Sequence, residues 1–585
     1  MIAGELVRER LLTDEPTVLH RFDAWARTQP DRPFFFYGED ERRFTYREFD
    51  LLTNRVANSL AALGIGRGDR VAVLSTNGLV CALGMFAAWK TGALYCPINY
   101  RFVGDLLAYV IDDLAPPVLI ADRHLVPALN DCRGRLTTGI PRVIVHAPAR
   151  DEADFDPRYE QALPHRDFRS TLFSELTAAG ETRPTAAIET DDLCSVVYTS
   201  GTTGNPKGVI HPHGWLRAFG TALATMTHRD DVLYCDLPLY HIGGAYANLV
   251  RAAWAGASIA VWNRFSPADF WRRIRLSGAS ITLLLDVMND WLMQQPERAG
   301  DRENPIIRAH VQPLPANHNT LARRFGLDFI AVGYGSTELG LGATGLIDEL
   351  GDAPGTPKHL WKGYDKQEIR AIVRAMAGEH AILDGSKPVP DGFMGRTPGV
   401  YEPVVTDRDG KPAPAGTPGR LTMRPVQPGI LFRGYLNKPD ATAASLRDGC
   451  FHSSDIVAAD DNGALYFMDR EQGFIRVRGE NVAATQVETL LNGHPGVSHC
   501  AVVAVPAGEG SEDDIGAFIV PERTASLSAR EISEWARTAL PKFMRPRHVR
   551  IVEALPVTQT MKVEKYRLRE QLVTELESGR LNRRA

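Results

Sequence analysis

One short stretch, residues 198–208 with the sequence YTSGTTGNPKG, constrains this chain more than any other. The β-branched run at residues 195–198 predicts a strand before it, and Val209 and Ile210 predict a strand after it. Glycines let backbone N–H groups approach an anion, hydroxyls add neutral donors, and Lys207 adds a positive charge. We therefore predict a polyphosphate-binding loop between two strands, made by Thr199, Ser200, Gly201, Thr202, Thr203, Gly204 and Lys207.

This loop differs from the phosphate loop of Walker-type nucleoside triphosphatases. There a Ser or Thr follows the lysine and a helix begins, whereas here Gly208 follows Lys207 and the second strand is predicted. A polar surface loop rich in Ser, Thr and Gly is the plain alternative. The order of glycines, hydroxyls and lysine favours phosphate binding over that alternative.

Length and composition bound the remaining possibilities. With 585 residues, 44% of them hydrophobic, we expect a soluble globular chain with several cores, because single cores stop growing near ~250–300 residues. The net charge of −5 gives no reason to expect nucleic acid as a partner. Residues 1–15 lack an apolar signal and no apolar run reaches membrane-spanning length, so we expect a cytoplasmic protein without a transmembrane segment. The seven scattered cysteines predict neither disulfides nor a zinc site.

Strand and helix patterns alternate at short spacing, which predicts an α/β architecture. Residues 45–48 (TYRE) are a capping box for a helix that runs toward Gly64, and residues 82–89 predict a buried helix. Further strands are expected at residues 71–74, 118–121, 143–145, 329–332, 500–505 and 517–520, a helix at 366–377, and a capping box at Ser528 and Glu531. Residues 147–192 are polar and predict a long surface connection.

Several motifs along the chain, in the same order, resemble those of the adenylate-forming superfamily, which includes acyl-CoA synthetases. They are residues 198–208, 237–244 (LPLYHIGG), 333–338 (GYGSTE), 451–455 (FHSSD), 469–470 (DR), 478–482 (RGENV) and 555–562 (LPVTQTMK). Within the superfamily, the sequence most resembles crotonobetaine/carnitine-CoA and fatty-acyl-CoA ligases. The resemblance implies a large multi-sheet N-terminal domain (1–468), a hinge (469–473) that includes Gln472, and a small mobile α/β C-terminal domain (474–585).

The resemblance also implies a nucleotide site. Tyr334 would stack beside adenine, Thr337 would touch phosphate, and Glu338 would hold Mg²⁺, a hard cation that prefers carboxylate and phosphate oxygens. Asp455 would accept both ribose hydroxyls, and the forked side chain of Arg470 would reach ribose and phosphate. The expected ATP-binding residues are Thr199, Ser200, Gly201, Thr202, Thr203, Gly204, Lys207, Tyr334, Gly335, Ser336, Thr337, Asp455, Arg470 and Lys562.

His241 and Gly243 are expected in the acyl pocket. Amino-acid-activating relatives carry an aspartate at the position of His241, so an α-amino acid would lack its counter-ion here. A packed, hydrogen-bonded structural histidine is the alternative for His241.

The catalytic residues that the resemblance implies are Lys562, Thr199 and Glu338. Lys562 would bridge the substrate carboxylate and the α-phosphate, although Met561 replaces the usual glycine before it, and a solvated lysine is the plain alternative. Gly479 and Glu480 would enter the site for the CoA half-reaction.

Residues 340–345 fit the dinucleotide fingerprint GxGxxG, but glycine and proline follow where a helix should begin, so we expect no dinucleotide site there. Residues 341–392 look like an insertion of open role.

These features predict an ATP-dependent carboxylic acid:CoA ligase that uses Mg²⁺, ATP and CoA and forms an acyl-AMP intermediate. An acyl-AMP ligase that loads a carrier protein is one alternative, and a nucleotide-binding protein without turnover is another. The acid stays open, and so does the oligomeric state, for which a homodimer is possible.

Overall fold

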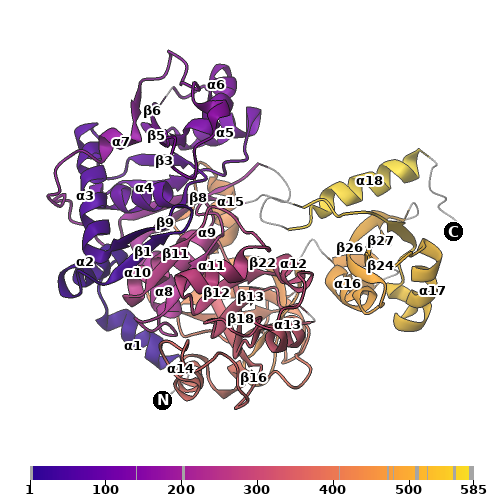
Figure 1. The fold of residues 1–585 in the computed structure, drawn as a ribbon. Helices are drawn as coiled ribbons and strands as arrows, with labels where there is room; N and C mark the ends of the chain where they lie inside the picture. The colour runs from indigo at the N-terminus through magenta and orange to yellow at the C-terminus, as the bar shows by residue number, and fades with distance from the viewer. Residues whose placement is uncertain are drawn as a thin grey trace. The chain divides into compact units, whose positions relative to one another are not determined.

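The computed structural model describes residues 4–139, 141–199, 205–315, 317–407, 409–470, 474–477, 480–507, 513–523, 525–557 and 562–578. These form two compact units (Figure 1). The larger unit takes the described residues of 1–199, 205–403 and 423–451, and the smaller takes those of 404–422 and 452–585. The chain therefore enters the smaller unit, returns to the larger one and leaves it again. Sheets and helices mix throughout, so the predicted α/β class is confirmed.

An eight-stranded sheet of the larger unit carries the predicted phosphate loop. Its strand order is β20-β9-β8-β4-β3-β5-β6-β7. The bounds are β3 Arg70–Leu74, β4 Leu94–Pro97, β5 Val118–Asp122, β6 Arg142–His146, β7 Ser170–Leu172, β8 Leu193–Tyr198, β9 Gly208–Pro212 and β20 Gly434–Tyr435. The strands predicted at residues 71–74, 118–121 and 143–145 are confirmed. The prediction of a plain connection over residues 147–192 is wrong in part, because β7 extends the sheet beside β6 and a short helix, α7 (Phe173–Leu176), follows.

A nine-stranded sheet forms the other half of the larger unit, in the order β16-β15-β14-β13-β12-β10-β11-β1-β2. The bounds are β1 Pro33–Tyr37, β2 Arg42–Thr45, β10 Val232–Cys235, β11 Ser258–Val261, β12 Ile281–Leu285, β13 Arg308–Gln312, β14 Phe329–Ser336, β15 Gly340–Asp348 and β16 Ile382–Asp384. Residues 340–345 begin strand β15, which pairs antiparallel with β14. A strand therefore stands where the dinucleotide fingerprint would open a helix.

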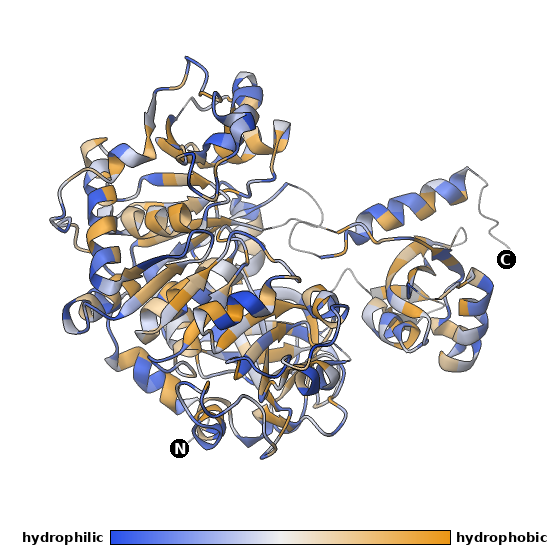
Figure 2. Cartoon of the chain, in the orientation of Figure 1, coloured by the Kyte–Doolittle hydropathy of each residue, from blue (hydrophilic) through white to orange (hydrophobic). Residues whose placement is uncertain are grey.

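The helix α4 (Gly78–Thr91) is buried along its whole length. It is apolar on nearly every side, as expected of a helix enclosed by protein, and Figure 2 shows it orange along its length. It packs against α3 (Tyr46–Ala62), whose predicted capping box of Thr45 and Glu48 is confirmed. The one charged residue of α4, Lys90, donates hydrogen bonds to the Asp50 carboxylate and to oxygens of Thr53 and Asn54.

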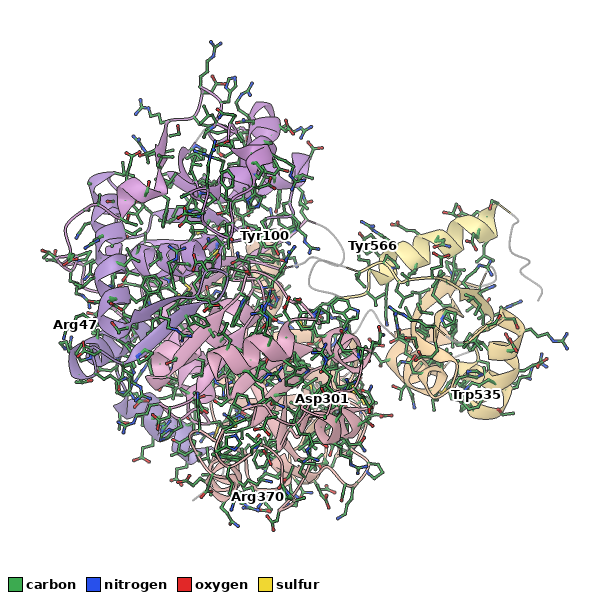
Figure 3. The ribbon with its side chains drawn as sticks, viewed as in Figure 1. Arg47, Tyr100, Asp301, Arg370, Trp535 and Tyr566 are labelled. Atoms are coloured by element: carbon green, nitrogen blue, oxygen red, sulfur yellow. The ribbon has the colours of Figure 1, made fainter. Side chains whose placement is uncertain are left out.

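The other helices of the larger unit are α1 Glu5–Thr13, α2 Val18–Thr28, α5 Gly104–Leu114, α6 Val126–Cys132, α8 His213–Ala224, α9 Ile242–Gly244, α10 Arg251–Ala255, α11 Phe270–Ser277, α12 Asp286–Met293, α13 His318–Phe325, α14 Lys366–Ala377 and α15 Pro439–Ser445. The predicted helix at residues 366–377 is α14. Arg370, labelled in Figure 3, pairs with the Asp348 carboxylate at 2.7 Å, and Lys366 pairs with Asp328 at 2.6 Å. The segment that looked like an insertion is thus tied to β15 and to the residue before β14.

Strand β23 (Leu465–Arg470) and all but the first two residues of its antiparallel partner β22 (Cys450–Ala459) belong to the smaller unit. Strand β19 (Gly419–Pro425), which begins in the smaller unit and ends in the larger one, lies next to β22. The smaller unit also has a β24–β25 hairpin (Phe474–Val477, Glu480–Ala483), a sheet of β26 (Val497–Pro506), β27 (Asp513–Pro521) and β28 (His548–Ile551), and helices α16 Ala484–Asn492, α17 Ala529–Ala539 and α18 Lys565–Glu577. The predicted strands at residues 500–505 and 517–520 and the Ser528–Glu531 capping box are confirmed.

Within the described residues, no helix is both long and apolar enough to cross a membrane. The seven cysteines are free.

Candidate active site

The neck of the predicted phosphate loop is a hairpin between β8 and β9. Tyr198 lies opposite Gly208. One step further along, Thr199 N donates to the Lys207 carbonyl at 3.0 Å, and Lys207 N donates to Thr199 Oγ1 at 3.4 Å. The prediction that the loop connects two strands is confirmed. Ser200, Gly201, Thr202, Thr203 and Gly204 lie outside the described residues.

Helix α5 anchors both ends of this loop. Tyr198 donates its hydroxyl to Asp113 Oδ2 at 2.7 Å, and Tyr109 donates its hydroxyl to the Pro206 carbonyl at 3.2 Å. Asn437 Nδ2 donates to Asp113 Oδ1 at 3.1 Å. Burial, followed by the neighbouring Asp113 carboxylate, raises the pKa of Tyr198. The phenol therefore stays protonated and remains a hydrogen-bond donor, so the N-terminal end of the loop is attached to α5.

Tyr435 connects the phosphate loop to the second predicted motif. It lies on β20, which pairs with β9, and the Lys207 ammonium lies 5.1 Å from the centre of its ring. Its hydroxyl donates to Glu338 Oε1 at 2.8 Å. Burial, with the Glu338 carboxylate as a further cause, raises the pKa of Tyr435. One aromatic side chain thus brings together the cation and the carboxylate that the sequence proposes for phosphate and metal.

The motif at residues 333–338 continues β14 into the turn before β15. The pairing register shifts between Tyr334 and Gly335, so the two strands diverge from regular pairing there. A Cβ at Gly335 would lie 2.3 Å from the carbonyl of Gly340, which explains why glycine is required. Tyr334 and Thr337 are buried, and Ser336 Oγ accepts a hydrogen bond from the backbone N–H of Leu339 at 3.2 Å.

Two aromatic side chains hold the backbone that presents Glu338. His211 Nε2 donates to the Thr337 carbonyl at 2.7 Å, and Trp215 Nε1 donates to the Glu338 carbonyl at 2.9 Å. Burial lowers the pKa of His211 to about 4, so the ring is neutral near pH 7 and its Nδ1 accepts from Ser195 Oγ at 3.0 Å. The phosphate hairpin and the Glu338 turn are therefore connected through one fixed histidine.

The predicted acyl-pocket segment follows β10 and enters α9. His241 Nδ1 accepts the backbone N–H of Gly243 at 3.2 Å and caps α9. A Cβ at Gly244 would lie 2.5 Å from the Pro238 carbonyl, whereas one at Gly243 would meet its nearest neighbour at 3.4 Å. The chain continues through a π-helical turn, Ala245–Val250, a geometry often found at functional sites. The imidazole thus has the capping contact expected of a structural histidine, a role that is compatible with a place beside a substrate.

A buried carboxyl that the sequence reasoning missed lies just before this segment. Asp236 follows β10 and is 3% exposed, and its Oδ2 has no hydrogen-bond partner among the described residues. Burial raises its pKa to about 7, partly offset by Tyr234 and Arg273. Only packing reveals this carboxyl, because nothing in its sequence neighbourhood marks an acidic site.

The smaller unit holds the remaining predicted residues. Asp455 and Arg470 face each other across β22 and β23, with Arg470 Nε 3.8 Å from Asp455 Oδ1. Lys562 is exposed and precedes Val563, which forms an isolated bridge with Val557 ahead of α18. Gln472 and Gly479 lie outside the described residues, and Glu480 is described only by its backbone in β25. The structure therefore pairs the two proposed ribose contacts with each other.

Comparisons with known proteins identify the family. The family model "AMP-binding enzyme" matches residues 22–436, and the model "AMP-binding enzyme C-terminal domain" matches residues 486–562. The chain belongs to the AMP-binding enzyme family, in which it is an AMP-forming acid–thiol ligase of the acyl-CoA synthetase type. The resemblance drawn from the motifs is confirmed.

Individual relatives agree with this assignment. Crotonobetaine/carnitine-CoA ligase of Salmonella paratyphi A is 28% identical over 535 residues, which are 90% of this chain and 93% of the relative. ATP-bound MatB from Rhodopseudomonas palustris superposes with a TM-score of 0.74 at 23% identity, covering 94% of this chain and 99% of that one. The anthranilate-CoA ligase AuaEII in complex with anthranoyl-AMP superposes with a TM-score of 0.76 at 22% identity, covering 96% and 98%. These two structures support the fold.

Proposed function

We propose that this ligase first joins a carboxylic acid to ATP, giving acyl-AMP and pyrophosphate, and then transfers the acyl group to CoA, releasing AMP. The assignment of residues rests on one observation, the contact of Tyr435 with both the Lys207 ammonium and the Glu338 carboxylate beside the phosphate hairpin. We call this group of three residues the Tyr435 junction. A cation for phosphate and a carboxylate for a metal are what a polyphosphate substrate requires together.

The first half-reaction brings two anions together, a carboxylate and the α-phosphate. Their repulsion is offset by positive charge placed in advance, for which we propose Lys207 on the loop and Lys562 at the reacting carboxylate. Thr199 and the residues 200–204 would add neutral donors to the phosphate oxygens. The substrate is already ionised at pH 7, so this scheme needs no general base.

Glu338 is proposed to hold Mg²⁺. Among the described residues no cluster of three or more His, Cys, Asp or Glu could hold a metal, so Glu338 would act as a single protein carboxylate. That donor set fits Mg²⁺, which commonly takes one or two carboxylates and completes its shell with water and substrate phosphates. Bound there, Mg²⁺ would neutralise charge on the departing pyrophosphate. The contribution of the chain is to fix the carboxylate, through the Tyr435 hydroxyl and the Trp215 contact to the Glu338 backbone.

For the nucleoside, Tyr334 is proposed beside adenine, with Gly335, Ser336 and Thr337 near the phosphates, and Asp455 and Arg470 at the ribose. The facing positions of Asp455 and Arg470 support this, since a diol needs a carboxylate acceptor and the neighbouring phosphate needs a forked donor. For the second half-reaction we propose that residues 474–585 move about residues 469–473, with Gln472 in this hinge, so that Lys562 withdraws and Gly479 and Glu480 approach.

The acid is proposed to lack an α-ammonium group. His241, whose Nδ1 accepts the backbone N–H of Gly243, offers no anionic counter-ion at this position of the acyl segment. The names of the relatives, crotonobetaine/carnitine-CoA ligase and anthranilate-CoA ligase, supply three acids to test first: crotonobetaine, carnitine and anthranilate.

The test is release of pyrophosphate and AMP from ATP and Mg²⁺ with fatty, aryl, branched and betaine-type acids, each with and without CoA. Acid-dependent pyrophosphate release that turns over only with CoA supports the proposal. Pyrophosphate release that CoA leaves unchanged contradicts CoA as the acceptor and directs the search to a carrier protein. ATP binding without acid-dependent release from any acid contradicts turnover.

A further inference from the structure

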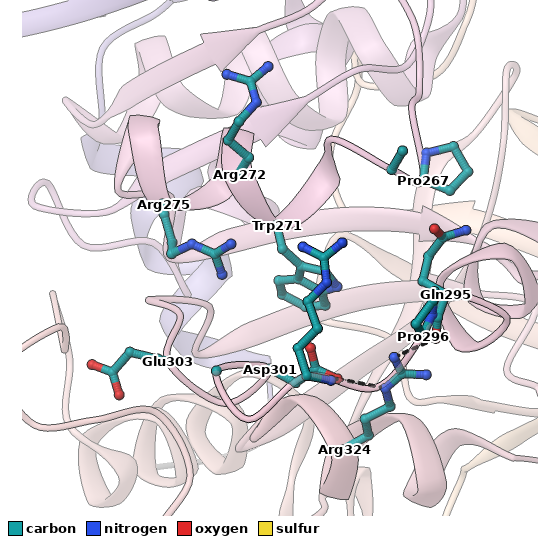
Figure 4. Close-up of a pocket in the computed structure, with 12 residues that line it drawn as sticks. Pro267, Trp271, Arg272, Arg275, Gln295, Pro296, Asp301, Glu303 and Arg324 are labelled. Carbon is teal, nitrogen blue, oxygen red and sulfur yellow. Dashed lines mark hydrogen bonds and ion pairs between the residues drawn. The ribbon is translucent and has the colours of Figure 1, made fainter.

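One cavity of the larger unit contains none of the residues proposed for the reaction. It measures about 310 Å³ and is lined by residues of α11, of the segment after α12 and of α13 (Figure 4). The lining residues that matter here are Trp271, Arg275, Arg298, Asp301 and Arg324. A volume of this size suits a small organic ligand.

The floor of the cavity is already fixed. Arg324 Nε donates to Asp301 Oδ2 at 2.9 Å, and its two terminal nitrogens donate to the carbonyls of Met293 and Gln295 at 2.7 Å each. Both charged side chains are nearly buried, at 9% and 12% exposure. Arg324 therefore uses all three of its nitrogens to hold the segment after α12.

Two other arginines are not engaged in this way. In the part of the chain that the structure describes, the guanidinium groups of Arg275 and Arg298 have no hydrogen bond or ion pair, although both line the cavity. Arg275 lies in the last turn of α11, and Figure 4 shows its side chain reaching toward Trp271. By contrast, the third arginine of the rim, Arg272, pairs with Asp269 at 3.1 Å. Two free forked donors from separate elements match a dianionic group such as phosphate.

The cavity also has an apolar wall. Trp271 stacks on Phe325 at 4.3 Å between ring centres, and Pro267, Ala268 and Pro296 line the space beside it. The stacked pair holds the indole in place, so a ligand could use the wall without a cost in side-chain ordering. The carboxylates of the lining are occupied, since Asp301 holds Arg324 and Glu303 pairs with His359 at 3.0 Å.

We propose that this cavity binds an aromatic phosphate, with the phosphate on Arg275 and Arg298 and the ring against the wall at Trp271. An aryl phosphate and a nucleoside phosphate share this chemistry. The site is separate from the Tyr435 junction, because none of the residues proposed for the reaction lines it.

Calorimetric titration with phenyl phosphate, AMP and inorganic phosphate tests the proposal. The starting protein is the full-length Lys207→Ala variant, in which phosphate binding at the proposed loop should be weakened. Three double variants combine this substitution with Arg275→Ala, Arg298→Ala or Arg323→Ala. Arg323 is an exposed neighbour of Arg324 that does not line the cavity, so its loss gives the same change in charge. The expected result is saturable phenyl phosphate binding that weakens at least about tenfold in each of the first two variants and less than twofold with Arg323→Ala. Inorganic phosphate should bind more weakly than phenyl phosphate.

Tighter binding of AMP than of phenyl phosphate, with the same arginine dependence, identifies the ligand as a nucleotide. The proposal is overturned if no probe saturates at millimolar concentration or if the Arg275 and Arg298 variants bind like the Arg323 control. It is also overturned if phenyl phosphate binds the unmodified protein but not the Lys207→Ala variant. Unchanged thermal unfolding of these exposed-site variants verifies that they are folded.

Discussion

The attachment of the phosphate loop to α5 predicts that Tyr198→Phe impairs one half-reaction selectively. The substitution keeps the ring but removes the hydroxyl that donates to Asp113 at 2.7 Å. A hydrogen bond to a charged group contributes about 1.5–3 kcal/mol. Asp113 keeps the Asn437 contact, so no carboxylate is left without a donor, and we expect the lower end of this range. Since 1.4 kcal/mol corresponds to tenfold, kcat/KM for ATP in acyl-AMP formation should fall by about tenfold.

The assay compares acyl-AMP formation from ATP with thioester formation from supplied acyl-AMP, which does not use the loop to hold pyrophosphate. Thioester formation should change by less than about twofold. Tyr37→Phe is the matched control, because the hydroxyl of Tyr37, on β1 of the other sheet, donates a similar bond to the Asp154 carboxylate at 2.9 Å. It should lower the midpoint of thermal unfolding without changing kcat/KM for ATP. Equal losses in both half-reactions, or no loss in acyl-AMP formation, would refute the anchoring role of Tyr198.

Four further predictions follow from the site. Lys562→Ala should reduce acyl-AMP formation by at least ~10²-fold, measured by pyrophosphate release, and leave thioester formation from acyl-AMP nearly intact. Glu338→Gln should raise the Mg²⁺ concentration needed for half-maximal pyrophosphate release, with ATP held constant. Burial lowers the pKa of His211 from 6.5 to about 4, so on acidification the unfolded chain binds a proton before the folded chain does. The free energy of unfolding should therefore fall as pH drops from 6.5 to 4. Urea titrations of His211→Gln should show a smaller change in the free energy of unfolding over this pH range. Burial raises the pKa of Asp236 from 3.8 to about 7, so stability should fall as pH rises through that window, and Asp236→Asn should be more stable than the parent at pH 8 but not at pH 4.

Features encoded by neighbouring residues were predictable from the sequence. The periodicity of residues 366–377 predicts both ends of α14, and the structure adds a capping box of Asp365 and Glu368 at its start. The strand, loop and strand around Lys207 were predicted for the same reason, since apolar runs and glycines act locally.

Features made by residues distant in the chain could not be predicted in this way. Tyr435 belongs to a two-residue strand whose partner, β9, lies far earlier in the chain, and no periodicity can appear over two residues. Asp113 is an ordinary polar residue near the end of an amphipathic helix until the fold places Tyr198 beside it. The roles of Lys562 and Gly479 came from the family resemblance, and their tests are biochemical.

The return of the chain to the larger unit has a consequence for synthesis on the ribosome. Strand β9 leaves the exit tunnel soon after its neighbour β8. Its other neighbour, β20, is translated much later, since Gly434, which pairs with Ile210, lies far along the chain. At ~5–20 residues per second the growing chain carries this open edge for roughly 11–45 s. Unpaired strand edges invite pairing with other chains. The strand that brings Tyr435 to the phosphate hairpin therefore also seals that edge, and a nascent chain stalled before residue 434 would expose it to aggregation.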